Sequence, residues 1–395
     1  MSRPDTGSAS YRAVLAVPHA RGLFAAAMIA RLCYGLLGLP LLLALRDGTG
    51  SFAVAGTATG LFGLVSALLG PARARLVQRR HSALMLLAVC YALCLSALAV
   101  ACAVGVPSPL AIGLAALTGL FPPPVGPLMR TLWGKLVPGE AQRQCALSLD
   151  TAAESTVFAV GPVLGGFLVA VFSAPAVLAG CAALVLTGFG LLATALRRTP
   201  VSVHSASPAA TGGGGPLRTA GFPPLLLLAW GVATALSAAE VGVVAAWGTM
   251  TAGVLTALFA VGGVLGGLVY GRGQWRGALV RRPLVLAACS AACYAVPALV
   301  YVPPAAGAAL LLAGACTDIL LITAYQLVDV LVPEDSRTEA GAWLNTAYNL
   351  GWAMGAGAGG ALVDRSGPPA SFAATAGMVA LCALVCALHA RRRRA

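Results

Sequence analysis

Long apolar stretches follow one another along almost the whole chain, and each is about long enough to cross a lipid bilayer. A helix needs about 20 apolar residues to do so, because it rises about 1.5 Å per residue through a hydrocarbon core about 30 Å thick. Of the 395 residues, 59% are hydrophobic and only 9% are charged, which is too apolar for a soluble domain of this length. The sequence therefore predicts an all-α polytopic membrane protein.

Proline, glycine or charged residues divide these stretches into twelve predicted spans. They lie near residues 22–45, 51–72, 82–105, 109–133, 144–172, 174–196, 222–246, 249–271, 283–303, 305–331, 338–363 and 369–390. Because the number is even, both termini are expected on the same side of the membrane.

Basic residues mark one side of this topology. The loops on the opposite side carry only Arg46 and Arg365. Since short loops rich in Lys and Arg stay in the cytoplasm, we expect cytoplasmic N and C termini in a multi-pass protein of the bacterial inner (cell) membrane. The net charge of +13 then reflects topology and not nucleic-acid binding. The loops after the even-numbered spans carry Arg73, Arg75, Arg79, Arg80, Lys135, Arg143, Arg197, Arg198, Arg218, Arg272, Arg276, Arg281, Arg282 and Arg337.

Several classes of site are not expected. The four His residues lie outside the spans or at their ends, and the Cys pairs at i, i+4 lack His or acidic partners, so we predict no metal, haem or other cofactor. The glycine run 355–360 lies within a span and follows no strand, and Lys135 lacks the other residues of a phosphate-binding loop. We therefore predict that the chain is not an enzyme.

The two halves of the chain resemble each other. Leu136-Val137-Pro138 recurs as Leu331-Val332-Pro333, which is 333 − 138 = 195 residues later. At the same offset Asp150 and Glu154 correspond to Asn345 and Asn349, so each half places two polar groups at i, i+4 on one helix face. We predict two pseudo-symmetric six-helix bundles, residues 1–196 and 222–395, joined by a polar cytoplasmic linker at 197–221 and ending in a basic tail.

This arrangement resembles the major facilitator superfamily over essentially the whole chain. Local motifs add to the resemblance. They are Gly161, Pro162, Gly165 and Gly166, which look like the end of the antiporter motif GPxxGG, the basic segment 70–80, and the run from Arg337 to Arg365, which looks like bacterial efflux-type members. The resemblance implies twelve transmembrane helices and transport by alternating access.

Few charged residues lie inside the predicted spans, where burial of an ion costs at least ~2.5 kcal/mol. Arg31 and Glu154 lie about 15 and 16 Å from the cytoplasmic ends of their spans, and Asp318 lies about 22 Å from its own. Facilitator-type sites occur near this depth. We predict a switchable Arg31–Glu154 ion pair, with the static pair that only neutralises itself as the alternative, and a coupling proton on Asp318 or Glu154. Asp150 and Glu240 are further candidates.

Polar and aromatic side chains within the spans are candidates for the lining of a substrate cavity. The prolines at 122–124 and Pro127 should also break the fourth span, and the carbonyl groups that they free must find partners in the protein or in cavity water. The candidate lining residues are Tyr34, Trp230, Tyr325, Gln326, Asn345 and Asn349.

Taken as a whole, the sequence predicts proton-coupled export of a small organic molecule by a monomeric secondary transporter. Its partners would be that substrate, protons and the lipid bilayer, with no nucleic acid. Uptake or facilitative uniport of a neutral metabolite is the alternative transport hypothesis. A membrane sensor or scaffold that transports nothing is the alternative from another class.

Overall fold

The structure, a computed structural model, describes residues 10–80, 82–137, 139–199, 215–273, 275 and 278–392. Every regular element in these ranges is a helix. The α-helices are α1 (Tyr11–Ala16), α2 (Ala20–Thr49), α3 (Phe52–Arg79), α4 (Ala83–Val104), α5 (Ser108–Thr118), α6 (Val125–Leu136), α7 (Glu140–Val171), α8 (Ala174–Arg198), α9 (Phe222–Arg272), α10 (Arg282–Leu299), α11 (Pro303–Leu331) and α12 (Arg337–Arg392). Short 3-10 turns lie at η1 (Pro216–Arg218), η2 (Leu279–Arg281) and η3 (Glu334–Ser336).

Two of the long helices each contain two spans. The backbone of α9 leaves helical geometry at Gly248 (φ 78°) and that of α12 at Gly367 (φ 77°). Glycine reaches positive φ without the clash of a Cβ atom, so the chain turns back at both points. Ten helical segments among the described residues are long and apolar enough to span a bilayer. This number counts the two parts of α9 separately but counts α12 only once. The second half of α12 and the broken pair α5–α6 complete the twelve predicted spans, and the predicted fold class is confirmed.

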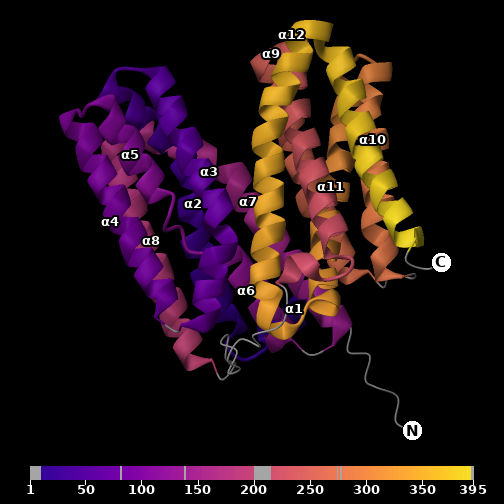
Figure 1. Cartoon of the computed structure of the whole chain (residues 1–395), viewed down its shortest axis with the longest axis horizontal. Coiled ribbons are helices and arrows are strands. Elements are labelled where there is room, and N and C mark those ends of the chain that lie inside the picture. The colour runs from indigo at the N-terminus through magenta and orange to yellow at the C-terminus, as the bar shows by residue number, and fades with distance from the viewer. Residues whose placement is uncertain are drawn as a thin grey trace.

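The helices form two lobes. Figure 1 shows α2 to α8 in one lobe and α9 to α12 in the other, with both termini toward the same end. One buried apolar cluster consists only of residues from the second lobe. The other fills the first lobe and continues into Phe222, Ile322 and Leu344 of the second, so the two lobes share part of their packing. The predicted domain boundaries stay a prediction, because residues 200–214 of the linker lie outside the described residues.

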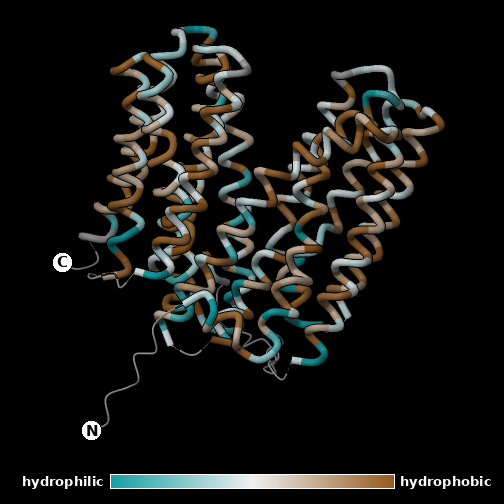
Figure 2. The backbone as a smooth tube through the Cα atoms, turned by 180° about the vertical axis from the view of Figure 1, so that it is seen from behind, coloured by the Kyte–Doolittle hydropathy of each residue, from teal (hydrophilic) through white to brown (hydrophobic). Residues whose placement is uncertain are grey.

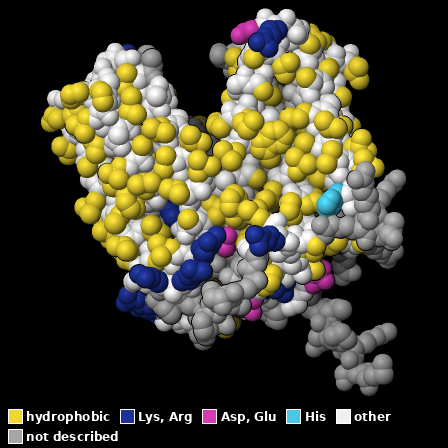
Figure 3. Space-filling view, in the orientation of Figure 1, with side chains coloured by type: hydrophobic (Ala, Val, Ile, Leu, Met, Phe, Trp, Pro, Cys, Tyr) yellow, Lys and Arg dark blue, Asp and Glu magenta, His cyan; other side chains and the backbone are white. Residues whose placement is uncertain are grey.

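The outer surface of both lobes is apolar. Figure 2 shows hydrophobic residues in the helices of both lobes, interspersed with less apolar ones, and Figure 3 shows hydrophobic side chains over the flanks, with basic side chains gathered toward the end that carries the termini. Large side chains such as Leu93, Phe167 and Leu299 are 64%, 64% and 82% exposed. In water such a surface would be unfavourable, whereas hydrocarbon accommodates it.

The lobes touch at the terminal end and separate at the other, where Figure 3 shows a notch between them. Lys135 forms a salt bridge of 2.8 Å with Glu334, and Gln144 Nε2 donates to the Tyr270 carbonyl at 2.6 Å. The hydroxyl of Tyr11 donates to the Leu268 carbonyl, and burial raises the pKa of that hydroxyl. The structure is therefore closed on the side of the termini.

One predicted loop is helical. Residues 70–79 continue α3, which ends at Arg79, whereas the prediction ended this span near residue 72 and placed the basic residues in a loop. Arg73 is only 7% exposed and its guanidinium group lies inside the first lobe. It is thus not one of the cytoplasmic surface charges that the sequence analysis counted.

Candidate functional site

Two arginines and two carboxylates form a closed cluster inside the first lobe. Both η nitrogens of Arg31 on α2 donate to the two carboxylate oxygens of Asp150 on α7, each at 2.8 Å. Arg31 is 2% exposed and Asp150 is fully buried. Arg130 on α6 donates to Glu154, which lies one turn after Asp150. The cluster has no net charge, as expected for ions that are withdrawn from water.

The two pairs also contact each other. Arg31 Nε lies 3.8 Å from Glu154 Oε1, and Arg130 Nε lies 4.0 Å from Asp150 Oδ2. Asp150 and Glu154 share a face of α7 because they are four residues apart, so one helix presents both carboxylates to the two arginines. The predicted approach of Arg31 to Glu154 is present, but the main partner of Arg31 is Asp150.

Arg130 is a member of the cluster that was not predicted from the sequence. It lies in the fourth predicted span, six residues after the proline run at 122–124, and it is 8% exposed. A second arginine inside an apolar span was a visible signal, because a buried cation requires an acidic partner. Its guanidinium carbon also lies 3.9 Å from the ring centre of Tyr325 on α11, so the cluster reaches the second lobe through a cation–π contact.

Asp318 on α11 lies outside this cluster, at the boundary between the lobes. It is 7% exposed, and its Oδ2 accepts a hydrogen bond of 2.8 Å from the Ser155 hydroxyl on α7. A Cβ atom at Gly263 on α9 would lie 2.7 Å from the same oxygen, so this glycine makes room for the carboxylate. In the described ranges no basic side chain forms a salt bridge with Asp318. Asp318 is thus a buried carboxylate held by one hydrogen bond across the lobes.

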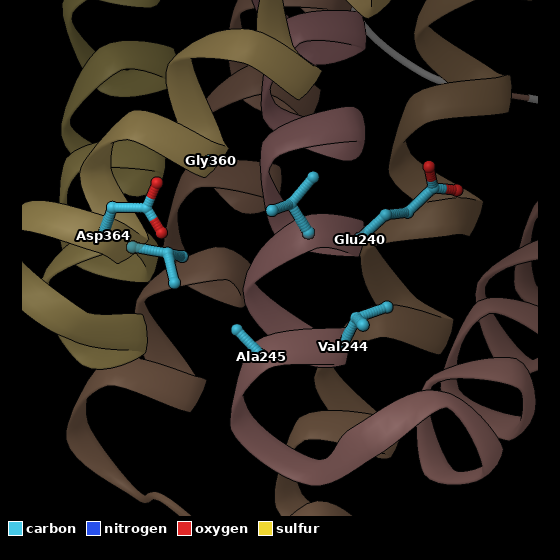
Figure 4. Close-up of a pocket in the computed structure, with 7 residues that line it drawn as sticks. Glu240, Val244, Ala245, Gly360 and Asp364 are labelled. Atoms are coloured by element: carbon cyan, nitrogen blue, oxygen red, sulfur yellow. The ribbon is translucent and has the colours of Figure 1, made fainter. Parts of the chain in front are cut away.

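Glu240 lines a groove between α9 and the first half of α12. The groove encloses about 400 Å³ and is bordered by valines, Gly360 and Asp364 as well. Figure 4 shows the Glu240 carboxylate pointing away from Asp364. Glu240 is half-buried and accepts no hydrogen bond from a described side chain. No salt bridge to Glu240 occurs among the described residues, so its role as a further coupling candidate stays a prediction.

Several polar and aromatic side chains on α11 point toward neighbouring helices. Tyr325 is 6% exposed beneath Arg130, and Gln326 is 4% exposed and accepts a hydrogen bond of 3.1 Å from the Tyr270 hydroxyl. Asp329 lies 3.7 Å from Arg143 of the first lobe. This part of α11 therefore forms part of the contact between the lobes.

The other predicted lining residues are more scattered. The Tyr34 ring packs within the first lobe against Tyr91 and Phe189, and Trp230 packs against the apolar core of the second lobe. Asn345 and Asn349 are exposed, unlike their counterparts on α7. The structure does not bring these four side chains together, and a lining role for them stays a prediction.

The antiporter-like motif lies where α7 crosses α2. A Cβ atom at Gly161 would lie 2.4 Å from the Gly35 carbonyl group, and one at Gly165 would lie 2.9 Å from the Leu36 oxygen. Gly166 faces the Leu39 side chain more loosely, and the side chain of Pro162 lies outside the described residues. The motif glycines thus permit close packing of the two helices that carry Arg31 and Asp150.

The described residues contain no group of three or more His, Cys, Asp or Glu side chains that is arranged to hold a metal ion.

The sequence matches the family model described as "Major Facilitator Superfamily" over residues 23–356. No curated protein sequence matches the chain.

Three solved structures illustrate the likeness in fold. The human organic anion transporter MFSD10 has a TM-score of 0.70 at 16% identity, with 93% of this chain and 99% of that chain covered. A bacterial homologue of the iron transporter ferroportin in an outward-facing state has a TM-score of 0.68 at 15% identity, with 94% and 99% covered. The E. coli fucose:proton symporter FucP has a TM-score of 0.69 at 15% identity, with 95% and 99% covered.

Proposed function

The chain belongs to the major facilitator superfamily, and from this premise we propose that it is a secondary active transporter that exports a small organic molecule in exchange for protons. The proposal places it in the cell membrane with both termini in the cytoplasm, in line with the one-sided distribution of arginine in the sequence. The notch between the lobes then opens outward.

The environment of Asp318 is the main support for this proposal. A coupling residue must bind and release a proton in every cycle, and a carboxylate locked to an arginine stays ionised. Asp150 is such a locked carboxylate, whereas among the described residues Asp318 has only the Ser155 hydroxyl as a hydrogen-bond partner. Burial disfavours the charged form of a carboxylate. Separation of the lobes around Asp318 would hydrate it and favour release of the proton, so protonation and conformation are linked at this residue.

The charge cluster supports a substrate without strong negative charge. Arg31 and Arg130, the two arginines of the charge cluster, are both held by carboxylates. An anionic substrate would have to displace one of those carboxylates before it could pair with either of these two arginines. We therefore propose a neutral or cationic amphiphile as the substrate.

A flux experiment tests the proposal. A thermal-shift screen of amphiphiles on the purified protein identifies a compound that binds, because binding to the folded state raises its apparent stability. Proteoliposomes that contain a pH-sensitive dye then receive that compound on the outside. Exchange for protons makes the lumen more alkaline, symport makes it more acidic, and uniport leaves its pH unchanged.

The matched variants are Asp318→Asn and Asp335→Asn, the latter at an exposed carboxylate in η3. We expect Asp318→Asn still to carry the compound across the membrane but to lose the accompanying pH change. Asp335→Asn should behave as the wild type. An undiminished pH change in Asp318→Asn would exclude this residue as the coupling site. Absence of any compound flux in the wild type would favour the sensor or scaffold alternative.

A further inference from the structure

The broken fourth span leaves carbonyl groups without their helical donors. In an α-helix each carbonyl oxygen accepts from the N–H group four residues later, and proline has no N–H. The prolines at 122–124 therefore leave the carbonyls at 118–120 without donors, and Pro127 does the same for Pro123. Buried carbonyl groups in this position require other partners.

Arg73 supplies the donors for two of these carbonyls. Its Nη1 donates to the oxygens of Gly119 and Leu120 at 3.0 and 3.1 Å. Its Nη2 donates to the Ser66 oxygen of its own helix, α3, at 2.6 Å. One guanidinium group thus joins α3 to the end of α5.

The remaining two carbonyls have local partners. The Thr118 oxygen accepts from the Phe121 N–H at 3.3 Å, in a tighter turn than the α-helical one. The Pro123 oxygen accepts from the Tyr34 hydroxyl at 2.8 Å and from the Val125 N–H at 2.9 Å. All four carbonyls that the prolines affect therefore accept a hydrogen bond, and Arg73 is the donor to those of Gly119 and Leu120.

The charge of Arg73 is balanced by these carbonyl dipoles. The side chain is 7% exposed, and no salt bridge to it occurs among the described residues. A cation is stabilised at a helix C-terminus, where the carbonyl groups point outward, and Gly119 is the C-cap of α5. A buried arginine without an acidic partner therefore has a physical reason to occupy this position.

We propose that Arg73 is a positioning residue that replaces the missing backbone donors of the fourth span and so fixes the direction in which α6 leaves the break. Helix α6 begins at Val125 and carries Arg130 to Glu154. The position of the charge cluster thus depends on an arginine of another helix. This inference is independent of the substrate and of proton coupling.

Hydrogen exchange on the purified full-length chain in lipid nanodiscs tests the proposal. In Arg73→Met we expect the amides of residues 119–126 to exchange at least about tenfold faster than in the wild type, because two buried carbonyls lose their donors and the break opens locally. The matched control is Arg79→Met, at an exposed arginine of the same helix, and it should leave this segment unchanged.

Restoring the backbone donors separates positioning from a general structural effect. In Pro123→Ala/Pro124→Ala the alanine N–H groups are available to the Gly119 and Leu120 carbonyls, so Arg73→Met added to this background should change exchange by less than about twofold. An equal effect of Arg73→Met in both backgrounds would overturn the proposal, and so would unchanged exchange in Arg73→Met alone.

Two further comparisons keep the test decisive. If Arg73→Met does not fold, Arg73→Lys replaces it, because one ammonium group cannot span the three carbonyls and should still accelerate exchange in the wild-type background only. The unfolding midpoint provides the second readout. Arg73→Met should lower it less in a Glu154→Gln background, where the contact that Arg73 positions has already been weakened. Equal losses with and without Glu154→Gln would contradict the link to α6.

Discussion

Asp150→Asn is the substitution that should most strongly disturb the first lobe. It preserves the shape of the side chain but removes the charge that balances Arg31. Both partners are at least 98% buried, and two hydrogen bonds of 2.8 Å join them. An arginine left in such a site has neither water nor a full counter-charge around it.

The magnitude follows from the geometry of the cluster. Removal of one partner of a buried ion pair costs about 3–5 kcal/mol. Glu154 Oε1 lies 3.8 Å from Arg31 Nε and partly replaces the lost carboxylate, so we expect the lower value, about 3 kcal/mol. This corresponds to a shift of about 150-fold in the unfolding equilibrium.

Equilibrium unfolding in mixed micelles, followed by tryptophan fluorescence, measures this loss. The matched control is Asp47→Asn in the exposed pair Arg46–Asp47, where the carboxylate side chain is 52% exposed and the expected loss is below about 1 kcal/mol. The double substitution Arg31→Leu/Asp150→Leu should be less damaging than Asp150→Asn, because it leaves no unpaired charge. Losses of the same size for Asp150→Asn and Asp47→Asn would refute the reasoning.

Three further predictions address packing, the contact between the lobes, and topology. Gly262→Ala should prevent close packing of α9 on α11, because its Cβ would lie 1.8 Å from a carbonyl oxygen of α11. A Cβ at Gly253 meets nothing within 4 Å, so the thermal unfolding midpoint should fall strongly in Gly262→Ala but not in Gly253→Ala. Thr346→Val should lower the free energy of unfolding by about 1–3 kcal/mol, because the Thr346 hydroxyl donates at 2.7 Å to an α3 carbonyl that Pro71 leaves without a donor. Thr194→Val, at an exposed position, should have little effect on unfolding in mixed micelles. A reporter fused after residue 395 should indicate the cytoplasm, and an external signal would contradict the predicted topology.

The positions of the spans were predictable because they depend on local composition. Hydropathy and the breaks at proline and glycine locate α2 to α12 within a few residues, and the turns at Gly248 and Gly367 lie where the predicted spans meet. The proline run also marked the interruption between α5 and α6. The end of α3 was placed too early, because charge was taken to end the helix, although arginine and alanine both favour helix.

The identity of the charged partners was harder to predict, because it depends on how each helix is rotated about its axis. Depth along the span brought Arg31 and Glu154 to the same level, but it did not distinguish Asp150 from Glu154 as the main partner. Arg130 contacts Glu154 from another helix, and Arg73 contacts the end of α5. No spacing within one helix reveals such contacts. They become visible only when the carbonyl groups freed by proline and the buried cations are each assigned a partner.

The contact between Arg130 and Tyr325 joins two positions that the predicted repeat makes equivalent. The repeat offset found at Pro138 and Pro333 also relates residue 130 to residue 325, since 325 − 130 = 195. Two residues related by a two-fold axis meet each other only if both lie close to that axis, and here the guanidinium carbon is 3.9 Å from the ring centre. With two equivalent halves, arginine would face arginine, and like charges would repel in a poorly hydrated site. An aromatic ring on one side converts that repulsion into a cation–π attraction. At this position, an arginine can therefore be accommodated in only one of the two halves.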